Sequence, residues 1–224
     1  MVKNIVVLIS GSGSNLQALI DACTSSKIPN ARIIRVFSNR KAAYGLTRAS
    51  SASPPIPTDI LALQPYLKAN PGKSREDYDV EVARRILSAT AERNERIDIA
   101  VLAGWMHVLS EAFLDVLSGQ TPYDGEHKVE SSIPILNLHP ALPGAFDGAN
   151  AIPRALEAFQ KGEVKHTGVM VHKVIKEVDR GEPVLVREVE ILPEDDLAAL
   201  ETRIHAVEHE IIVEAVAKIL AESS

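Results

Sequence analysis

Two polar side chains that could perform acid–base chemistry follow an apolar run in the second half of the chain. Residues 133–136 are typical of a buried strand, and Asn137 and His139 come directly after them. Because side chains alternate along a strand, the amide and the imidazole share one face. The carboxyl ends of strands bind ligands in open α/β sheets, so this pair could stabilise an oxyanion and transfer a proton. Polar residues that only cap a turn are the alternative.

A glycine-rich turn near the N-terminus has the composition of an anion-binding loop. The apolar run at residues 4–9 predicts a strand, and apolar residues at helical spacing follow the turn Gly11, Ser12, Gly13, Ser14 and Asn15. Glycines let the backbone approach an anion, and the next helix offers N–H groups. The turn lacks the spacing of a dinucleotide fingerprint or a Walker A motif, which favours a single phosphate group. An ordinary tight turn is the alternative.

His172 and Asp179 form a third candidate group. His172 lies in a strand-like run, and Asp179 lies in the turn-rich stretch after it. If that loop folds back beside His139, the carboxylate of Asp179 can orient the imidazole or favour its charged form. An aspartate before a glycine turn is also a common structural feature, so this position alone indicates no function.

The last predicted helix carries His205, Glu208 and His209 on one face, because residues three and four apart are neighbours on a helix. Such spacing occurs in zinc sites, but further spaced ligands are lacking and a metal would leave the glycine loop without a role. The pattern therefore argues against a metal site. Glu208 is expected to face a pocket or to form a pair at the surface.

An apolar segment, Trp105-Met106-His107-Val108-Leu109, follows the strand expected at residues 97–103. A loop of this kind at the carboxyl end of a strand suits a flat aromatic ligand. Packing of these side chains into the core is an equally good interpretation.

The composition limits the class of partner. The chain has 224 residues, 46% of them hydrophobic, and a formal net charge of −6. This balance is typical of a globular protein and argues against a nucleic-acid or anionic-membrane surface as the main function. Cys23 is the only cysteine, so a reducing compartment is expected. We find no signal peptide pattern and no apolar run that could span a bilayer, and therefore expect a cytoplasmic location.

Strand-like and helix-like segments alternate over most of the chain and must position these groups. The expected strands lie at 4–9, 31–37, 97–103, 133–139, 169–174 and 184–191, with a short one near Ile56, and the expected helices begin after the glycine turn and span 42–49, 74–87, 110–117, 151–160 and 194–221. This order predicts an α/β fold with a mostly parallel sheet flanked by helices and an antiparallel portion in the C-terminal half. Residues 119–132 are polar and are expected to form a surface loop. No linker is evident, so residues 1–224 are expected to form one domain.

Five motifs in this order resemble the phosphoribosylglycinamide formyltransferases, a family of folate-dependent enzymes. The resemblance runs from Asn4 to about Ala217 and rests on VVLISGxGSNLQA at 6–18, VLAGWM at 101–106, NLHPAL at 137–142, HTGVxVH at 166–172 and EVDxGxP at 177–183. It implies a Rossmann-like formyltransferase fold. It also implies that the N-terminal half binds the phosphate of a ribonucleotide, whereas the C-terminal half binds folate and carries out catalysis.

The resemblance implies roles for individual residues. The catalytic triad of the family matches Asn137, His139 and Asp179, and His172 matches a histidine close to the active site. The phosphate loop of the family matches residues 11–15, and its substrate-contacting glutamate matches Glu208. The residues that match the folate site are Arg75, Met106, His107, Val108, Leu109, Val174 and Glu177.

The implied reaction transfers the formyl group of 10-formyltetrahydrofolate to the amine of glycinamide ribonucleotide in de novo purine biosynthesis. Asn137 and protonated His139 would stabilise the oxyanion of a tetrahedral intermediate. Asp179 would keep His139 charged and assist proton transfer. The implied partners are these two small molecules, without metal, nucleic acid or membrane, and the implied assembly is a monomer or a weak homodimer.

The chain also departs from the family. His107 stands where many relatives carry arginine, Pro134 replaces a basic residue of bacterial relatives, and residues 120–132 resemble an insertion. The same triad occurs in methionyl-tRNA formyltransferase and in formyltetrahydrofolate hydrolase, but the extra domains usual in those enzymes are not indicated here. Alternatives of other classes are a catalytically silent phosphate-binding module and a metallohydrolase built on His205, Glu208 and His209.

Overall fold

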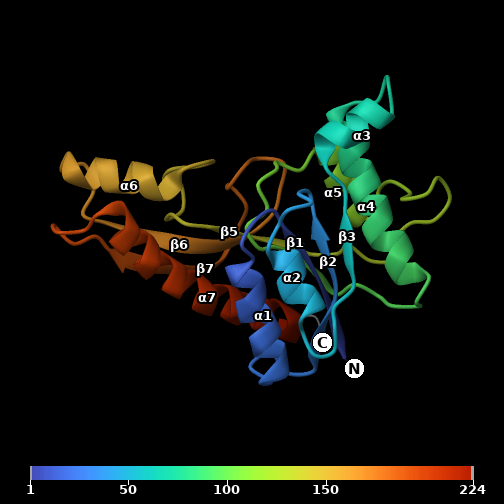
Figure 1. Cartoon of the computed structure of the whole chain (residues 1–224), viewed down its shortest axis with the longest axis horizontal. Helices are drawn as coiled ribbons and strands as arrows, with labels where there is room; N and C mark the ends of the chain where they lie inside the picture. The colour runs from blue at the N-terminus through green and yellow to red at the C-terminus, as the bar shows by residue number, and fades with distance from the viewer. Residues whose placement is uncertain (1, 223–224) are drawn as a thin grey trace.

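A seven-stranded sheet forms the centre of the computed structural model, which describes residues 2–222 (Figure 1). The strand order is β3-β2-β1-β4-β5-β6-β7, and the first five strands in this order are mutually parallel. Strand β6 runs antiparallel to both neighbours. The strands are β1 (Lys3–Ile9), β2 (Ala31–Ser38), β3 (Thr58–Ile60), β4 (Ile99–Leu102), β5 (Ile135–His139), β6 (His166–Lys173) and β7 (Pro183–Glu190). The predicted α/β class and the antiparallel C-terminal portion are confirmed.

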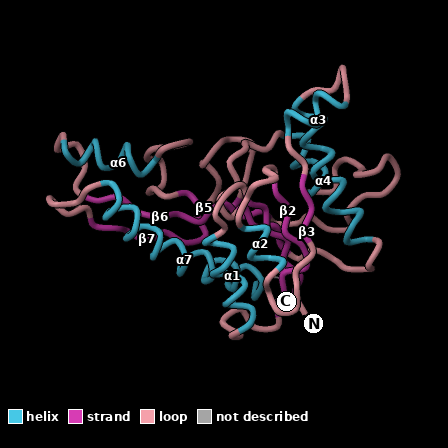
Figure 2. Tube along the Cα trace, viewed as in Figure 1, coloured by secondary structure: helices cyan, strands magenta, loops and turns pink. Residues whose placement is uncertain are grey.

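Helices cover the sheet, and the two ends of the sheet have different neighbours. The helices are α1 (Ser14–Thr24), α2 (Gly45–Ser50), α3 (Leu63–Ala69), α4 (Arg75–Ala91), α5 (Glu111–Leu117), α6 (Ala151–Gln160) and α7 (Leu197–Glu222). Figures 1 and 2 show α6 and α7 beside β6 and β7, whereas α3 and α4 lie near β2 and β3. None of the described helices has a stretch that is both long and apolar enough to cross a membrane.

The alternation of side chains along β1 divides the core into two layers. Ile5, Val7 and Ile9 belong to the cluster that includes apolar residues of α1 and α7. Val6 and Leu8 belong to the opposite cluster, with apolar residues of α4 and α5. All five side chains are fully buried. A central parallel strand is covered on both faces, which explains why its sequence is apolar without interruption.

The carboxyl ends of β1, β4 and β5 lie at one edge of the sheet, because neighbouring parallel strands run in register. Leu102 of β4 pairs with Asn137 of β5. The backbone N–H of Ser10, just after β1, donates to the carbonyl of Gly104, 3.0 Å away. The glycine turn, the apolar loop and the Asn137–His139 pair therefore meet at this edge.

Some boundaries differ from the sequence-based expectation. The short strand expected near Ile56 is β3, Thr58–Ile60, and the helix expected at 42–49 begins at Gly45. Helix α7 begins at Leu197 rather than at Glu194, because the Asp196 carboxylate accepts the N–H of Ala199 at 2.8 Å and caps the helix. Helix α3 was not predicted; it has only seven residues, and its apolar side chains Leu63 and Tyr66 are only partly buried against the core.

The polar segment 119–132 lies outside the sheet, but internal hydrogen bonds order it. The carboxylate of Asp124 accepts the backbone N–H groups of Glu126 and His127 at 3.0 and 2.7 Å. The ammonium of Lys128 donates to the carbonyl of Gln120 at 2.6 Å. These bonds lie within the surface loop that the composition predicted.

Candidate active site

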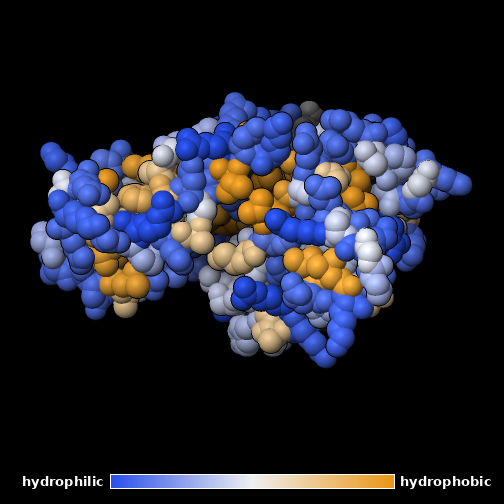
Figure 3. Space-filling view, turned by 90° about the horizontal axis from the view of Figure 1, so that it is seen from above, coloured by the Kyte–Doolittle hydropathy of each residue, from blue (hydrophilic) through white to orange (hydrophobic). Residues whose placement is uncertain are grey.

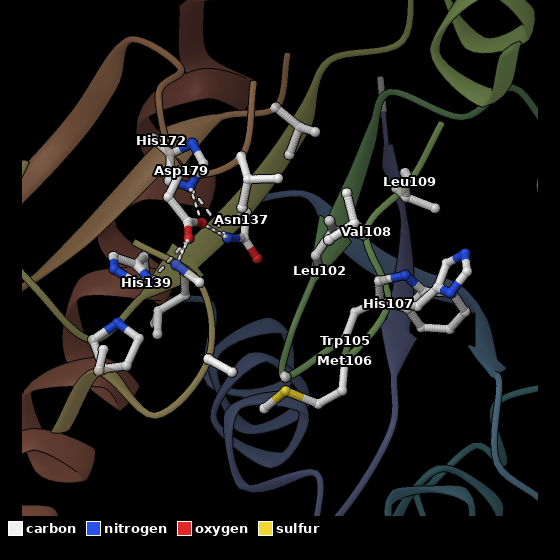
Figure 4. A pocket seen from close by; sticks show the side chains of 18 of the residues that line it. Leu102, Trp105, Met106, His107, Val108, Leu109, Asn137, His139, His172 and Asp179 are labelled. Atoms are coloured by element: carbon white, nitrogen blue, oxygen red, sulfur yellow. Dashed lines mark hydrogen bonds and ion pairs between the residues drawn. The ribbon is translucent and has the colours of Figure 1, made fainter. Parts of the chain in front are cut away.

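Four polar side chains converge beyond the carboxyl end of β5 (Figure 4). Asn137 and His139 come from β5, and His172 lies opposite Asn137 on antiparallel β6. The loop after β6 returns Asp179 to this cluster. His139, His172 and Asp179 are buried, with exposed fractions of 4%, 2% and 8%. The structure thus brings together the three residues predicted to be catalytic and the histidine predicted to support them.

The amide of Asn137 links His172 to Asp179. Its Nδ2 lies 3.1 Å from Nε2 of His172 and 3.2 Å from Oδ1 of Asp179. Nδ1 of His172 lies 2.9 Å from the carbonyl of Lys173, so this nitrogen carries a proton, and Nε2 also lies 3.5 Å from Oδ1 of Asp179. Both amide hydrogens of Asn137 are thereby engaged, and its oxygen points away from Asp179 (Figure 4). The amide must rotate before its NH₂ group can reach an oxyanion.

His139 faces an oxygen acceptor at each ring nitrogen. Nδ1 lies 3.4 Å from Oδ2 of Asp179, and Nε2 lies 3.4 Å from the carbonyl of Ala145. Two acceptors around one imidazole suit the doubly protonated cation, in which both nitrogens donate. Both separations are at the long end of the hydrogen-bond range, so a developing oxyanion can replace the carbonyl as the stronger acceptor.

Asp179 is held in its charged form. Burial by itself raises the pKa of the carboxyl, but contact with His172, the backbone N–H of Gly148 and the charge of His139 together bring it below its ordinary value. The N–H of Gly148 lies 2.8 Å from Oδ2. The glycine-flanked loop after β5 therefore contributes a hydrogen-bond donor to this carboxylate. The sequence did not indicate this contact.

An open cavity of about 430 Å³ lies over this cluster. Its floor includes Asn137, His139, His172 and Asp179, and its walls are the loop 104–109, the start of α6 and the segment 174–179. Among the described residues, four of the nine exposed large apolar side chains line it: Met106, Val108, Ile175 and Val178. Figure 3 shows apolar surface around a hollow near the middle of the molecule. An apolar cleft with a polar floor suits a flat ligand that presents a polar reactive group.

The loop 104–109 is fixed from behind by Asp79 of α4, a residue that sequence reasoning missed. Asp79 is fully buried; its Oδ1 lies 2.5 Å from Nε2 of His107, and its Oδ2 accepts the N–H of Ser110 at 2.9 Å. The ring of His107 consequently points away from the catalytic cluster (Figure 4). An acidic residue on the buried face of a predicted helix, beside Tyr78 and Val82, was the available signal.

The other residues expected at a folate site divide into three groups. Met106 and Val108 expose their side chains at the cavity, and Val174 and Glu177 also line it. Leu109 also borders the cavity, but its side chain is buried in the core. Arg75 lies outside the lining, where its guanidinium donates to the carbonyl of Val108.

The glycine turn precedes α1, as the sequence predicted. Gly13 has φ +71° and packs against Gly45 so closely that a Cβ would lie 2.6 Å from the Cα of that residue. Nε of Arg48 donates to the carbonyl of Ser12 at 2.9 Å. Asn15 is turned inward, where its amide donates to Oε2 of Glu208 at 3.2 Å. The turn therefore joins α2 and α7 to the end of β1.

Titratable side chains of α7 lie close to Arg48 where the helix passes this turn. Burial lowers the pKa of His209, and the nearby charges of His205 and Arg48 lower it further. Nε2 of His209 is buried and has no hydrogen-bond partner among the described residues. Burial raises the pKa of Glu208. Within residues 2–222 no three His, Cys, Asp or Glu side chains are arranged to hold a metal ion.

The fold and this cluster define a class of transferase. The model of the formyl transferase family matches residues 3–216, so the chain belongs to that family and is an enzyme that transfers a formyl group. The resemblance inferred from the five motifs is confirmed.

Similar proteins carry names that are more specific than that of the family. The phosphoribosylglycinamide formyltransferase of Schizosaccharomyces pombe is 47% identical over 225 residues, which is 100% of each chain. That of Dictyostelium discoideum is 46% identical over 96% of this chain and 97% of its own. The crystal structure of glycinamide ribonucleotide transformylase 1 from Symbiobacterium toebii has a TM-score of 0.77 and 34% identity, and the match covers 96% of this chain and 86% of that one.

Proposed function

We propose that this enzyme transfers the formyl group of 10-formyltetrahydrofolate to the amine of glycinamide ribonucleotide, a step of purine biosynthesis. The observation that carries the proposal is the convergence of Asn137, His139 and Asp179 at the floor of an apolar cavity, next to a glycine turn at a helix N-terminus. The names of the similar relatives support the same substrate.

The cavity fits a folate. Exposed Met106 and Val108 on one wall, with Ile175 and Val178 on the other, can enclose a flat ring system. Backbone groups of the loop 104–109 supply donors and acceptors, and Arg75, His107 and Leu109 hold that loop in place. Val174 and Glu177 complete the opposite wall. When bound, the folate supplies an electrophilic formyl carbon and a nitrogen leaving group.

The glycine turn is the proposed site of the ribonucleotide phosphate. Gly11, Ser12, Gly13, Ser14 and Asn15 place backbone N–H groups at the positive end of α1. The guanidinium of Arg48 adds positive charge beside the turn. Glu208 is suited to accept hydroxyl groups of the ribose, since only one of its oxygens contacts Asn15.

The catalytic cluster then acts on the amine and on the formyl oxygen. His139 donates to the oxyanion that develops as the amine attacks the formyl carbon, and the rotated amide of Asn137 adds a second donor. Asp179 keeps His139 protonated and, through water, receives the proton that the amine loses and passes it to the leaving nitrogen. His172 orients Asn137 and Asp179.

We infer further that residues 1–224 act as one domain, with ribonucleotide binding in the N-terminal half and catalysis in the C-terminal half. The folate wall at 104–109 belongs to the first half, so both halves build the folate site. We propose a cytoplasmic enzyme, a monomer or weak homodimer, that needs no metal and binds neither nucleic acid nor membrane.

A direct assay tests the proposal. Purified protein is mixed with 10-formyltetrahydrofolate and glycinamide ribonucleotide, and deformylation of the folate is followed by absorbance. We expect turnover that continues in a metal chelator and falls at least a hundredfold in kcat/KM with the riboside that lacks the phosphate, because the glycine turn then binds nothing. Deformylation without the ribonucleotide would identify a hydrolase instead, and no turnover would refute the proposal.

A further inference from the structure

Two loops meet over the catalytic carboxylate through an ion pair that lies outside the cavity. Asp147 belongs to the loop between β5 and α6, and Arg180 belongs to the loop between β6 and β7. The guanidinium Nη2 of Arg180 lies 2.6 Å from Oδ2 of Asp147. Neither residue lines the cavity, and Arg180 occupies a variable position of the motif at 177–183.

The ion pair closes a ring around Asp179. Arg180 directly follows Asp179, and Gly148 directly follows Asp147. The N–H of Gly148 donates to Oδ2 of Asp179 at 2.8 Å. The two loops are therefore joined at two points. The first is the hydrogen bond from Gly148 to the carboxylate of Asp179, and the second is the ion pair, which lies one residue away in each loop.

Each of the two loops contains a residue whose backbone conformation is unfavourable in isolation. Asp179 has φ +56° and Phe146 has φ +51°, in the left-handed region that residues other than glycine rarely adopt. Such conformations persist only where surrounding contacts enforce them. Arg154 of α6 holds the first loop, through a 2.8 Å bond to the carbonyl of Asp147. A Cβ at Gly181 would clash with the backbone of Lys173, which fixes the second loop on β6.

We propose that Asp147 and Arg180 are positioning residues, whose ion pair holds the loop 144–150 over Asp179 and keeps the N–H of Gly148 on its carboxylate. The proposal rests on the catalytic role proposed for Asp179. The side chains of Arg180 and Asp147 are 57% and 28% exposed, so the pair contributes little to global stability. Its effect is therefore local: it sets the geometry and the charge state of Asp179.

The pH dependence distinguishes positioning from a direct charge effect. The titratable groups that face Asp179 are His139 of β5 and His172 of β6, and the ion pair itself adds the charges of Arg180 and Asp147. If the pair acted only through its charges, Arg180→Ala would raise the pKa of Asp179, whereas Asp147→Asn would lower it. If the pair holds Gly148 in place, both variants lose the same hydrogen bond and both raise that pKa.

The first experiment measures kcat and KM against pH for Arg180→Ala, Asp147→Asn and Arg180→Lys. We expect kcat to fall about tenfold in the first two, with the acid limb of the kcat profile moved to higher pH in both and thermal unfolding unchanged. Arg180→Lys should recover most of the rate. Arg84→Ala is the matched control, because it removes a comparably exposed pair with Glu81 on α4. Acid limbs that move in opposite directions, or unchanged kcat, would overturn the proposal.

The second experiment does not depend on activity. Hydrogen exchange resolved by nuclear magnetic resonance reports the protection of the Gly148 N–H. We expect protection in the wild type and its loss, by tenfold or more, in Arg180→Ala and Asp147→Asn but not in Arg84→Ala. Equal protection in all proteins would refute the positioning role. Loss of protection in an enzyme that transfers no formyl group would instead refute the proposed function and leave intact the inference that the ion pair holds Gly148 in place.

Discussion

At the scale of single residues, charge placement around Asp179 and His139 is the basis of the proposed chemistry. His139 faces two oxygen acceptors, and Asp179 receives hydrogen bonds from Asn137 and Gly148. Each group is buried, so each depends on these few partners rather than on water. The cluster therefore behaves as one unit, in which the loss of one member affects the charge of the others.

Protonation of Asp179 should lower both the activity and the stability of the enzyme at acidic pH. Because its pKa is below the ordinary value in the folded state, its charged form stabilises the protein above the unfolded-state pKa of about 4, and this stabilisation is lost as pH falls through the folded pKa. We expect Asp179→Asn to lower kcat about 10²- to 10⁴-fold and to lower the free energy of unfolding at pH 7, a difference that disappears in acid.

The matched control for that variant is Asp195→Asn. The pKa of Asp195 is also lowered, here by Arg203, and the residue lies outside the cavity. Denaturant titrations against pH should show the same sign of change for both variants, but Asp195→Asn should keep full activity. Equal activity in Asp179→Asn and wild type would contradict the role of Asp179.

At the scale of elements, α7 carries a carboxylate whose burial opposes stability. Because burial raises the pKa of Glu208, the folded state binds the proton more tightly, and stability falls as pH rises from about 4 through the folded pKa. We expect Glu208→Gln to unfold at higher denaturant concentration than wild type at pH 7, and to raise KM for the ribonucleotide at least tenfold. Glu210→Gln, an exposed neighbour paired with Arg187, should change neither quantity.

Helix α4 should be needed to shape the folate wall. Asp79→Ala leaves the His107 ring and the N–H of Ser110 without their buried partner, which costs about 3 kcal/mol or more of unfolding free energy. The loosened loop should also raise KM for the folate while KM for the ribonucleotide stays the same. Asp79→Asn retains an acceptor for Ser110 and should lose much less of both. A folate KM unchanged in Asp79→Ala would show that the loop does not depend on this anchor.

At the scale of the whole molecule, the sequence predicted the parts that leave a local pattern. Strand β1 is apolar from Ile5 to Ile9 and the glycine turn follows it directly, and β5 begins with apolar residues before Asn137, so their placement at one sheet edge followed from the α/β order. Asp179 could be placed beside His139 only through the resemblance to a family, because loop closure leaves no periodic signal.

Local sequence patterns could not predict contacts between residues that are distant in the chain. Asp79 and His107 are distant in the sequence, as are Asp147 and Arg180, and each pair forms only after α4 or the loops have docked. The inward turn of Asn15 toward Glu208 depends in the same way on the packing of α1 against α7. The loop 104–109, the proposed folate wall, thus depends on a buried residue of α4, which holds it through the ring of His107 and the N–H of Ser110.

The most direct test of the account is the rate of formyl transfer by His139→Asn. In the proposed mechanism, His139, charged beside Asp179, stabilises the developing oxyanion at the end of β5. Single-turnover measurements with saturating 10-formyltetrahydrofolate and glycinamide ribonucleotide should show a rate about 10²- to 10³-fold below wild type, with both substrates still bound. His166→Asn, which changes an exposed histidine of β6, should match wild type. A rate for folded His139→Asn within a factor of about three of the wild type would contradict the account.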